Sequence, residues 1–504
     1  MSRIRVLSFG VVLLLAADGA LQAQGVATTG AAYGARPATA MSLLPMNTAS
    51  TAARAHAALG QRALDMQHPR EAAEHFREAV AADSSFAFGH LGLANSSTSL
   101  GEFTTNLRTA SRFAGKASRA EQLLIGIGQK ILDADLQGAA ALARELVKVA
   151  PSNPRSHLVL ANVLQQLGRE TEARQEMERA IALAPKFAPS YIQLGYSYLL
   201  ASPRAPAKAE AVIKKAVALE PEEPLPYIVL GSFGRATNQL EQARLAYTSA
   251  ARVDPASALA VQQRGHVNAF LGDYDAARAD YDAAIRLGRN NEPATYGVFR
   301  TRVSVYAGQP KEAIAELERF LAAVDTMSIP DRDGARLFAL SDQALIASHV
   351  GAFDEARRAL DRRTAVLRKL ADQVGTAEFR RTQEADIAYN DGLLALRQGD
   401  FAAATAKARE AMRLVAENGN PRKDEPAHAL LGFVALGQKQ YAEAVKHFEA
   451  ADPNDMYVAY HRALALEGVG RDGEAKKIFR DVATYNFSNA GPALVRADAK
   501  ARAE

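Results

Sequence analysis

The chain has 504 residues, of which 48% are hydrophobic, 23% are charged and none is cysteine or tryptophan. Disulfide bonds and a lipid anchor on an N-terminal cysteine are therefore excluded, and a formal net charge of +4 gives no support for a nucleic-acid-binding protein. Aromatic residues make up only 7% of the chain, so we expect helices to approach each other closely through small side chains.

The first 23 residues have the pattern of a secretory signal peptide. Arg3 and Arg5 precede an apolar run over residues 6–17, and small residues lead to Ala23. The alternative is a transmembrane anchor, but a run of about a dozen apolar residues is shorter than the roughly 20 that a helix needs to cross a bilayer. We predict cleavage after Ala23 and no transmembrane segment in the mature chain. The protein is then exported from a bacterial cell to the periplasm or the cell surface.

Residues 24–50 show neither a helical nor a strand period and are rich in alanine, threonine, glycine and serine. Such a composition is typical of a flexible leader. The short apolar piece at residues 41–47 offers an alternative, in which part of the leader docks into a neighbouring groove.

From residue 51 onward, small and apolar residues recur with a period of about 34 residues. Within each unit the apolar positions lie three and four residues apart, which places them on one face of each of two helices. One unit carries Leu160, Leu164, Gly168, Ala173, Ala180 and Pro185. The next two carry Leu194, Gly195, Tyr198, Ala209, Ala216, Pro221 and then Leu230, Gly231, Ala243, Tyr247, Ala250, Pro255.

Glycine ends the first helix of a unit, because it accepts the left-handed backbone that closes a helix. Proline ends the second helix, because it lacks an amide hydrogen. Small residues on facing positions let two helices approach closely. We therefore predict that Gly195 meets Ala209, and that Gly231 meets Ala243, where the two helices of a unit cross.

This pattern resembles the tetratricopeptide repeat family, whose motif orders Leu, Gly or Ala, Tyr, Ala, an aromatic residue, Ala and Pro across 34 positions. The resemblance extends over about residues 51–482. It implies an all-α fold, an α-solenoid of antiparallel helix pairs with about 11–12 units. The expected organisation is a regular array at 51–324, an irregular array at 325–485, and a cap or tail at 486–504.

Signatures of catalysis are missing from the sequence. The zinc-binding pattern H-E-x-x-H and the nucleophile pattern G-x-S-x-G do not occur. The nearest cluster of metal-binding residue types is His68, Glu71 and His75, at positions where charged residues on an exposed helix face are the simpler explanation. The sequence thus predicts no enzyme, no cofactor and no metal.

The resemblance implies that first-helix positions that do not pack inside a unit line the concave wall of the superhelix. Here these positions are Arg155, Leu158, Asn162, Gln165, Ile192, Tyr196, Leu199, Ile228, Ser232, Arg235, Gln262 and His266. Arg155 and Arg235 are suited to carboxylates, Tyr196 to anchoring a partner and Asn162 to a peptide backbone. The alternative is that they are solvated residues without a ligand.

We therefore expect an exported scaffold that binds a peptide or partner protein in its groove, and no nucleic acid. Envelope assembly, secretion and polysaccharide export are the processes that such a scaffold would serve. The alternative is a small-molecule receptor, or a module associated with an enzyme, that uses the irregular half between Pro330 and Pro421.

Overall fold

The structure is a computed structural model that describes residues 43–65, 69–97, 99–219 and 224–504. The predicted signal peptide and residues 24–42 of the predicted leader lie outside these ranges. The described residues form α-helices and two short 3-10 helices (Ala114–Lys116 and Val324–Thr326), and they contain no strand. No helix among them is both long enough and apolar enough to cross a membrane.

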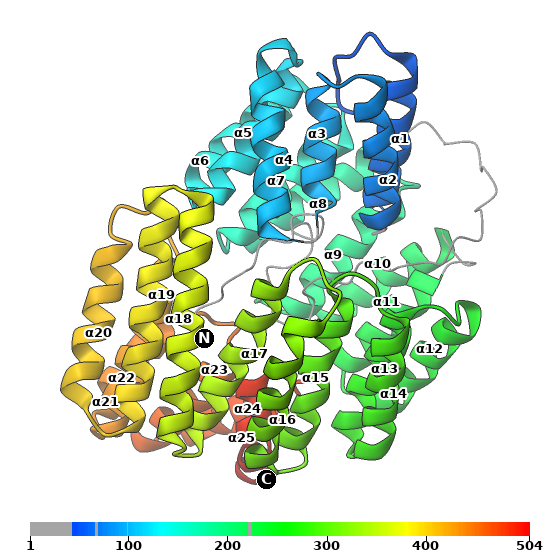
Figure 1. Ribbon diagram of the computed structural model, residues 1–504. Coiled ribbons are helices and arrows are strands. Elements are labelled where there is room, and N and C mark those ends of the chain that lie inside the picture. Colours follow the sequence, from blue (N-terminus) through cyan, green and yellow to red (C-terminus); the bar gives the residue numbers. More distant parts are fainter. Residues whose placement is uncertain (1–42, 66–68, 98, 220–223) are drawn as a thin grey trace.

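The helices pack as pairs in chain order (Figure 1). The first helices of the pairs are α1 (Thr51–Asp65), α3 (Ala87–Asn95), α5 (Arg119–Leu132), α7 (Pro154–Gln166), α9 (Ala188–Leu200), α11 (Pro224–Ala236), α13 (Ala258–Leu271), α15 (Glu292–Tyr306), α17 (Arg332–His349), α19 (Ala377–Arg397), α21 (Glu425–Gly437) and α23 (Met456–Gly468).

The second helices are α2 (Pro69–Ala82), α4 (Leu100–Phe113), α6 (Leu136–Val149), α8 (Glu170–Leu183), α10 (Pro206–Leu219), α12 (Leu240–Val253), α14 (Tyr274–Leu287), α16 (Pro310–Ala323), α18 (Phe353–Val374), α20 (Phe401–Leu414), α22 (Tyr441–Glu449) and α24 (Asp472–Ala483). A last helix, α25 (Ala490–Ala503), follows the twelfth described pair. The predicted all-α solenoid of antiparallel pairs is confirmed. The longest helices, α17, α18 and α19, have 18, 22 and 21 residues and open the segment predicted to be irregular.

The glycines inside the pairs lie against large side chains of the second helix, and not against the predicted alanines. A β-carbon placed on Gly231 would lie 2.5 Å from two ring carbons of Tyr247, and one on Gly195 would lie 2.8 Å from Cγ1 of Ile213. It is Gly234, one turn later, that faces Ala243. The prediction misplaced the contact because positions three and four residues apart share one face of a helix.

The same packing recurs along the array. In other pairs a glycine of the first helix lies against a phenylalanine ring of the second: Gly60 against Phe76, Gly297 against Phe320, and Gly432 against Phe448. The missing β-carbon makes room for the ring, so aromatic bulk is buried between two helices that remain close.

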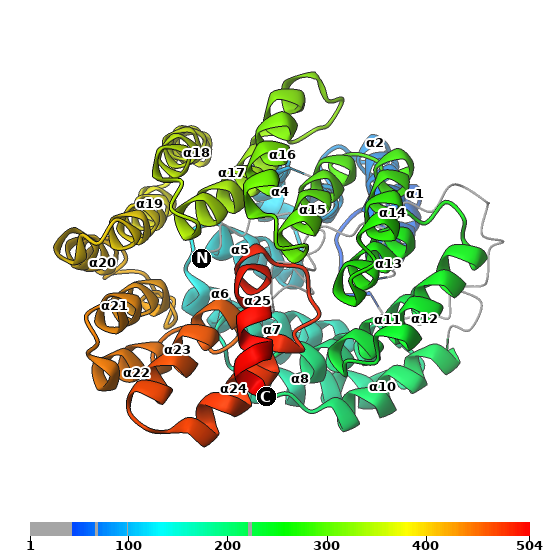
Figure 2. The same ribbon diagram turned by 90° about the horizontal axis from the view of Figure 1, so that it is seen from below.

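The pairs wind into a tight superhelix whose later turn meets its earlier one (Figures 1 and 2). Arg108 of α4 donates hydrogen bonds to the carbonyl oxygens of Val374 at 2.7 Å and Gln373 at 3.3 Å, at the end of α18. Seen from below, α25 lies in the middle of the ring of helices (Figure 2). The solenoid therefore closes on itself and holds its own last helix inside.

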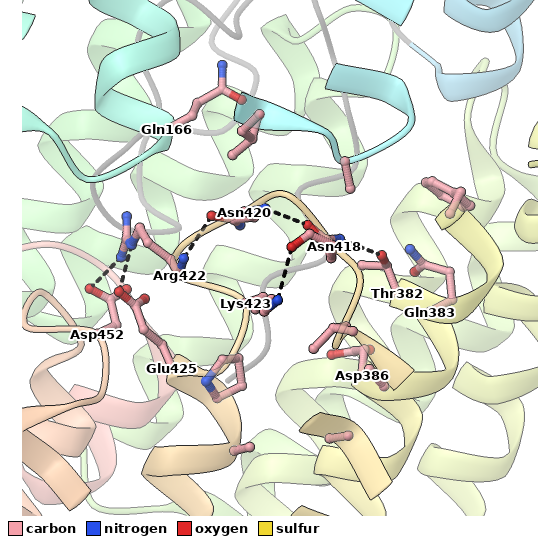
Figure 3. A pocket seen from close by; sticks show the side chains of 18 of the residues that line it. Gln166, Thr382, Gln383, Asp386, Asn418, Asn420, Arg422, Lys423, Glu425 and Asp452 are labelled. Carbon is pink, nitrogen blue, oxygen red and sulfur yellow. Dashed lines mark hydrogen bonds and ion pairs between the residues drawn. The ribbon is translucent and has the colours of Figure 1, made fainter. Parts of the chain in front are cut away.

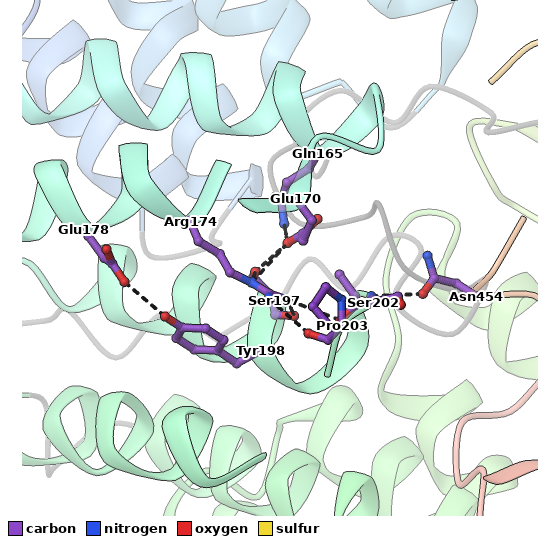
Figure 4. A network of polar contacts seen from close by, with 10 residues as sticks. Gln165, Glu170, Arg174, Glu178, Ser197, Tyr198, Ser202, Pro203 and Asn454 are labelled. Carbon is purple, nitrogen blue, oxygen red and sulfur yellow. Dashed lines mark hydrogen bonds and ion pairs between the residues drawn. The ribbon is translucent and has the colours of Figure 1, made fainter. Parts of the chain in front are cut away.

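A buried arginine shapes a second closing contact (Figure 4). Arg174 of α8 donates to Oγ of Ser197 at 2.7 Å and to the carbonyl oxygen of Pro203 at 3.0 Å. The loop held in this way presents the amide of Ser202 to Oδ1 of Asn454, at 3.2 Å, across 252 residues of sequence. Charge-assisted bonds to carbonyl groups thus fix a loop that links the first half of the array to the last.

Replacing Gly231 with alanine is expected to lower the melting temperature by a few degrees, because the new β-carbon overlaps the buried ring of Tyr247. Overpacking of this kind costs about 1–3 kcal/mol. Gly101→Ala in α4 is the matched control, since no atom lies within 4 Å of its β-carbon position. Helix propensity favours that change by about 1 kcal/mol. Equal melting temperatures for the two variants in thermal denaturation would contradict the packing described here.

Candidate functional site

The twelve residues predicted to line the groove are nearly all buried. Eleven of them are at most 9% exposed, and Gln165 alone is partly exposed. They therefore do not form an open, solvated wall in this structure. The superhelix is too tight for that, because successive first helices and the C-terminal residues cover its inner side. Their binding of a partner stays a prediction.

Several of these side chains already have partners within the chain. Arg155 forms a bidentate ion pair with Asp65 of α1, and its guanidinium lies 5.6 Å from the ring centre of Phe187. Burial raises the pKa of Tyr196 to about 12. Gln165 donates to Oε1 of Glu170 at 3.0 Å. The ion pair of Arg155 thus joins α7 to α1, three pairs earlier in the chain, whereas the hydrogen bond of Gln165 lies within one pair, between α7 and α8.

His266 is at the centre of a buried polar cluster. Its ring nitrogens hydrogen-bond to the hydroxyl of Tyr281 and to the amide of Gln262. Desolvation lowers the pKa of His266 well below its usual value, and the positive charges of Arg235 and Arg302 lower it further. A neutral histidine with both nitrogens engaged is a packing element and not an available ligand.

Asn162 is different, because its polar atoms have no partner among the described residues. The side chain is 7% exposed, and neither Oδ1 nor Nδ2 makes a hydrogen bond. In α9, Oε1 of Gln193 is in the same condition at 9% exposure. Unpaired buried amide groups cost about 1–3 kcal/mol each, so these two side chains destabilise the inner face as it is folded here.

Farther along the inner face, the loop at residues 484–489 occupies the groove. Nε of Arg235 donates to the carbonyl oxygen of Asn486 at 2.8 Å, and the amide of Asn486 donates to the carbonyl oxygen of Arg235 at 3.1 Å. The guanidinium of Arg235 also stacks on Phe487, 4.7 Å from its ring centre. The chain thus places its own polypeptide where the family resemblance implies a ligand.

A second arginine, which the sequence analysis missed, holds the same loop. Arg302 of α15 donates to the carbonyl oxygen of Ser488 at 2.7 Å. Asp342 of α17 balances the charge of Arg302: Nε of the arginine donates to Oδ2 of the aspartate at 2.6 Å, and Nη2 donates to Oδ1 at 3.1 Å. Both side chains are 4% exposed. The signal available was Phe487 in the segment predicted to be a cap or tail, directly after Tyr485 at the end of the predicted array, since exposed tails seldom carry large apolar side chains.

The cluster of His68, Glu71 and His75, which the sequence analysis weighed as a metal site, shows no metal-site geometry among the described residues. His68 lies outside them. In α2, Nε2 of His75 lies 4.0 Å from Oε1 of Glu71, as in an ordinary surface pair one helical turn apart.

A separate cavity of about 290 Å³ lies where the two turns of the superhelix meet (Figure 3). Its walls come from helices far apart in sequence, with α4 to α7 on one side and α18 to α23 on the other. Most of the surface is apolar, and it includes Leu100, Ile131, Leu136, Leu370, Val415 and Val458. The cavity exists only because the solenoid closes.

The loop between α20 and α21 forms the polar side of this cavity (Figure 3). Arg422 is held between Oε1 of Glu425 at 2.8 Å and Oδ1 of Asp452 at 3.0 Å. Nζ of Lys423 donates to the carbonyl oxygen of Asn418 at 3.2 Å. These contacts keep the loop rigid, so the cavity is preformed.

The Arg235→Ala variant is expected to loosen the loop at 484–489. Loss of charged hydrogen bonds to the loop lowers the free energy of opening the loop by about 2 kcal/mol. Amide hydrogen exchange in the loop and α25 should therefore be about 30-fold faster. Arg264→Ala on α13 is the control, because that guanidinium pairs with Asp280 instead, at 3.0 Å. Equal protection of residues 484–503 in the two variants, measured by mass spectrometry, would rule out this role of Arg235.

Models of the tetratricopeptide repeat match residues 130–194 and 258–291. The mouse (Mus musculus) protein O-mannosyl-transferase TMTC1 is 30% identical over 145 residues, which are 28% of this chain and 15% of that protein. Anaphase-promoting complex subunit 3 from Schizosaccharomyces pombe is 24% identical over 181 residues, or 36% of this chain and 27% of that protein. The chain thus spans less than a third of the length of each of these curated relatives.

Among solved structures, a tetratricopeptide repeat protein from Parabacteroides merdae covers 55% of this chain and 98% of its own, with 20% identity and a TM-score of 0.34. The two matched segments fall on α5 to α9 and on α13 to α14. Two segments of this all-α solenoid, residues 130–194 and 258–291, are therefore similar to tetratricopeptide repeats.

Proposed function

We propose that this chain is a protein-binding scaffold, exported from a bacterial cell, that brings partner proteins together during envelope assembly, secretion or polysaccharide export. The tetratricopeptide repeats support protein binding, and the pattern of residues 1–23 supports export. Of the two matched curated relatives, the one from Schizosaccharomyces pombe is, by its name, a subunit of a protein complex, and the one from mouse is, by its name, a transferase.

The unpaired amides of the inner face carry this proposal. Asn162 of α7 and Gln193 of α9 belong to successive first helices, and both are buried with polar atoms that lack a partner among the described residues. An extended peptide offers an N–H and a C=O at every residue, so its main chain can satisfy such amides. Both amides are closed off from solvent in this structure, so a partner segment that lies across α7 and α9 has to part the side chains that cover them.

The chain's own C-terminal loop supports the same chemistry in the neighbouring stretch of groove. There, Arg235 and Arg302 donate hydrogen bonds to main-chain carbonyl oxygens of the loop, and Phe487 stacks on the guanidinium of Arg235. Groups of this kind bind an extended polypeptide through its backbone and one aromatic anchor. A partner on α7 and α9 does not need to displace the loop, because the loop contacts α11 and α15.

The Asn162→Leu variant is the test of partner binding. Leucine has the same branched arrangement of heavy atoms and removes the unpaired amide, so the melting temperature should stay equal or rise, while capture of cross-linked partners from the host should fall by about tenfold. Asn106→Leu on the second helix α4 is the control, and it should leave capture unchanged. Equal capture by the two variants would contradict a partner site at Asn162.

Export is tested by the N-terminus of the protein purified from its host. Signal peptide cleavage after Ala23 should leave a mature chain that begins at Gln24, recovered in the periplasmic or extracellular fraction. N-terminal sequencing together with cell fractionation checks this. A chain that keeps residues 1–23 and stays in the cytoplasm would contradict the proposed role in the cell envelope, but it would not contradict protein binding itself.

A further inference from the structure

We propose that the superhelix opens where its two turns meet, between α4 to α7 and α18 to α23, and that this opening gives a partner access to the inner face at Asn162. We refer to the contact surface of these helices as the turn interface. The inference deepens the proposed scaffold function and rests on it in one respect, the use of Asn162 by a partner. The opening itself is a property of the fold.

The second turn covers the end of α7 that carries the unpaired amides (Figure 3). Gln166 lines the cavity between the turns, and Asn162 lies one helical turn earlier on the same face of α7. Nε2 of Gln166 and both polar side-chain atoms of Asn162 are buried without a partner among the described residues. Just after α7, a β-carbon placed on Gly168 would lie 3.0 Å from Cδ of Arg422, in the loop between α20 and α21. Movement of that loop away from α7 therefore uncovers this end of the helix.

The turn interface is packed less completely than the helix pairs. Within a pair, an aromatic ring fills the space beside a glycine, as Tyr247 does at Gly231. At the turn interface a cavity of about 290 Å³ remains, lined by Leu100 and Ile131 of the first turn and by Leu370 of the second. Side chains that border a void lack contacts on that side, so separation of the turns breaks fewer contacts than separation of a pair. Local opening is expected where buried contacts are fewest.

A charged side chain helps to hold the turns together. Arg108 of α4 is exposed, and its guanidinium donates to the carbonyl oxygens of Val374 and Gln373, which lie 2.7 Å and 3.3 Å away. These carbonyl groups are at the end of α18, where the helix dipole places partial negative charge. An exposed interaction of this type is weak, and salt screens it. Arg108 thus favours the closed ring by a small amount, which mutation or salt removes.

The test uses the full chain, which has no cysteine, with one cysteine introduced as a reporter. Asn162→Cys places a thiol on the buried face of α7, and the uncharged reagent N-ethylmaleimide reaches it when that face is uncovered. In this background Arg108→Ala is expected to speed labelling about fivefold, because loss of its hydrogen bonds favours the open ring. Arg77→Ala, which removes the same charge from an exposed position of α2, is the control and should leave the rate unchanged.

Two further reporters separate opening at the turn interface from loosening of the whole fold. Gln166→Cys lies on the same face of α7 and should respond as Asn162→Cys does, so the test does not depend on how well one variant folds. Ser232→Cys on α11 replaces a side chain that is 3% exposed and bonded within its own helix, to the carbonyl oxygen of Ile228 at 3.0 Å. Its labelling should not change with Arg108→Ala.

Salt gives a second readout of the same contact. Sodium chloride at about 1 M should speed labelling at Asn162→Cys in the chain that keeps Arg108, and not in Arg108→Ala, because the contact depends on charge. Equal rates in Arg108→Ala and Arg77→Ala at both α7 reporters, or an equal increase at Ser232→Cys, would overturn the proposal. Labelling needs no partner, so a failure of partner capture in Asn162→Leu would count against the scaffold function and not against the opening.

Discussion

The architecture depends on how closely the two helices of a pair approach. At Gly231 the first helix has no β-carbon, and the ring of Tyr247 fills the space against its backbone. The same contact joins Gly297 to Phe320 and Gly432 to Phe448. Since aromatic residues are few in this chain, placing them against these glycines stabilises the pairs that contain them. Because the two helices of such a pair lie close together, the pairs can stack into a superhelix of small radius, and its successive turns come into contact.

Tight winding explains both candidate sites. On the inner face, the remaining room is narrow, and the loop at 484–489 occupies the stretch over α11 and α15. Between the turns, surfaces from α5 and from α19 face each other without fitting completely, which leaves the cavity that Gln383 lines. One site comes from the curvature of the array and the other from its closure, so neither belongs to any single repeat.

The sequence predicted the helices and their pairing well, because the units contain their own signals: apolar positions on one face, a glycine where the first helix ends and a proline where the second helix ends. It did not predict burial of the groove residues. The curvature of a solenoid is a sum of small rotations between units, which no single unit specifies. Arg235 meets Asn486 across 251 positions of the chain, and no local pattern joins them. Gln383 likewise reads as one more helical residue, and only the folded chain shows that its amide oxygen has no partner among the described residues.

The contact of Arg108 with the end of α18 has a consequence for how the array can change its length. An open solenoid tolerates the gain or loss of one unit, because each unit touches only its neighbours. In this chain, one unit added between α4 and α18 would turn and shift everything after it, and would carry the carbonyl group of Val374 away from the guanidinium. The number of repeats is therefore tied to ring closure, and insertions or deletions of whole units between these two helices would be selected against as strongly as damage to the core.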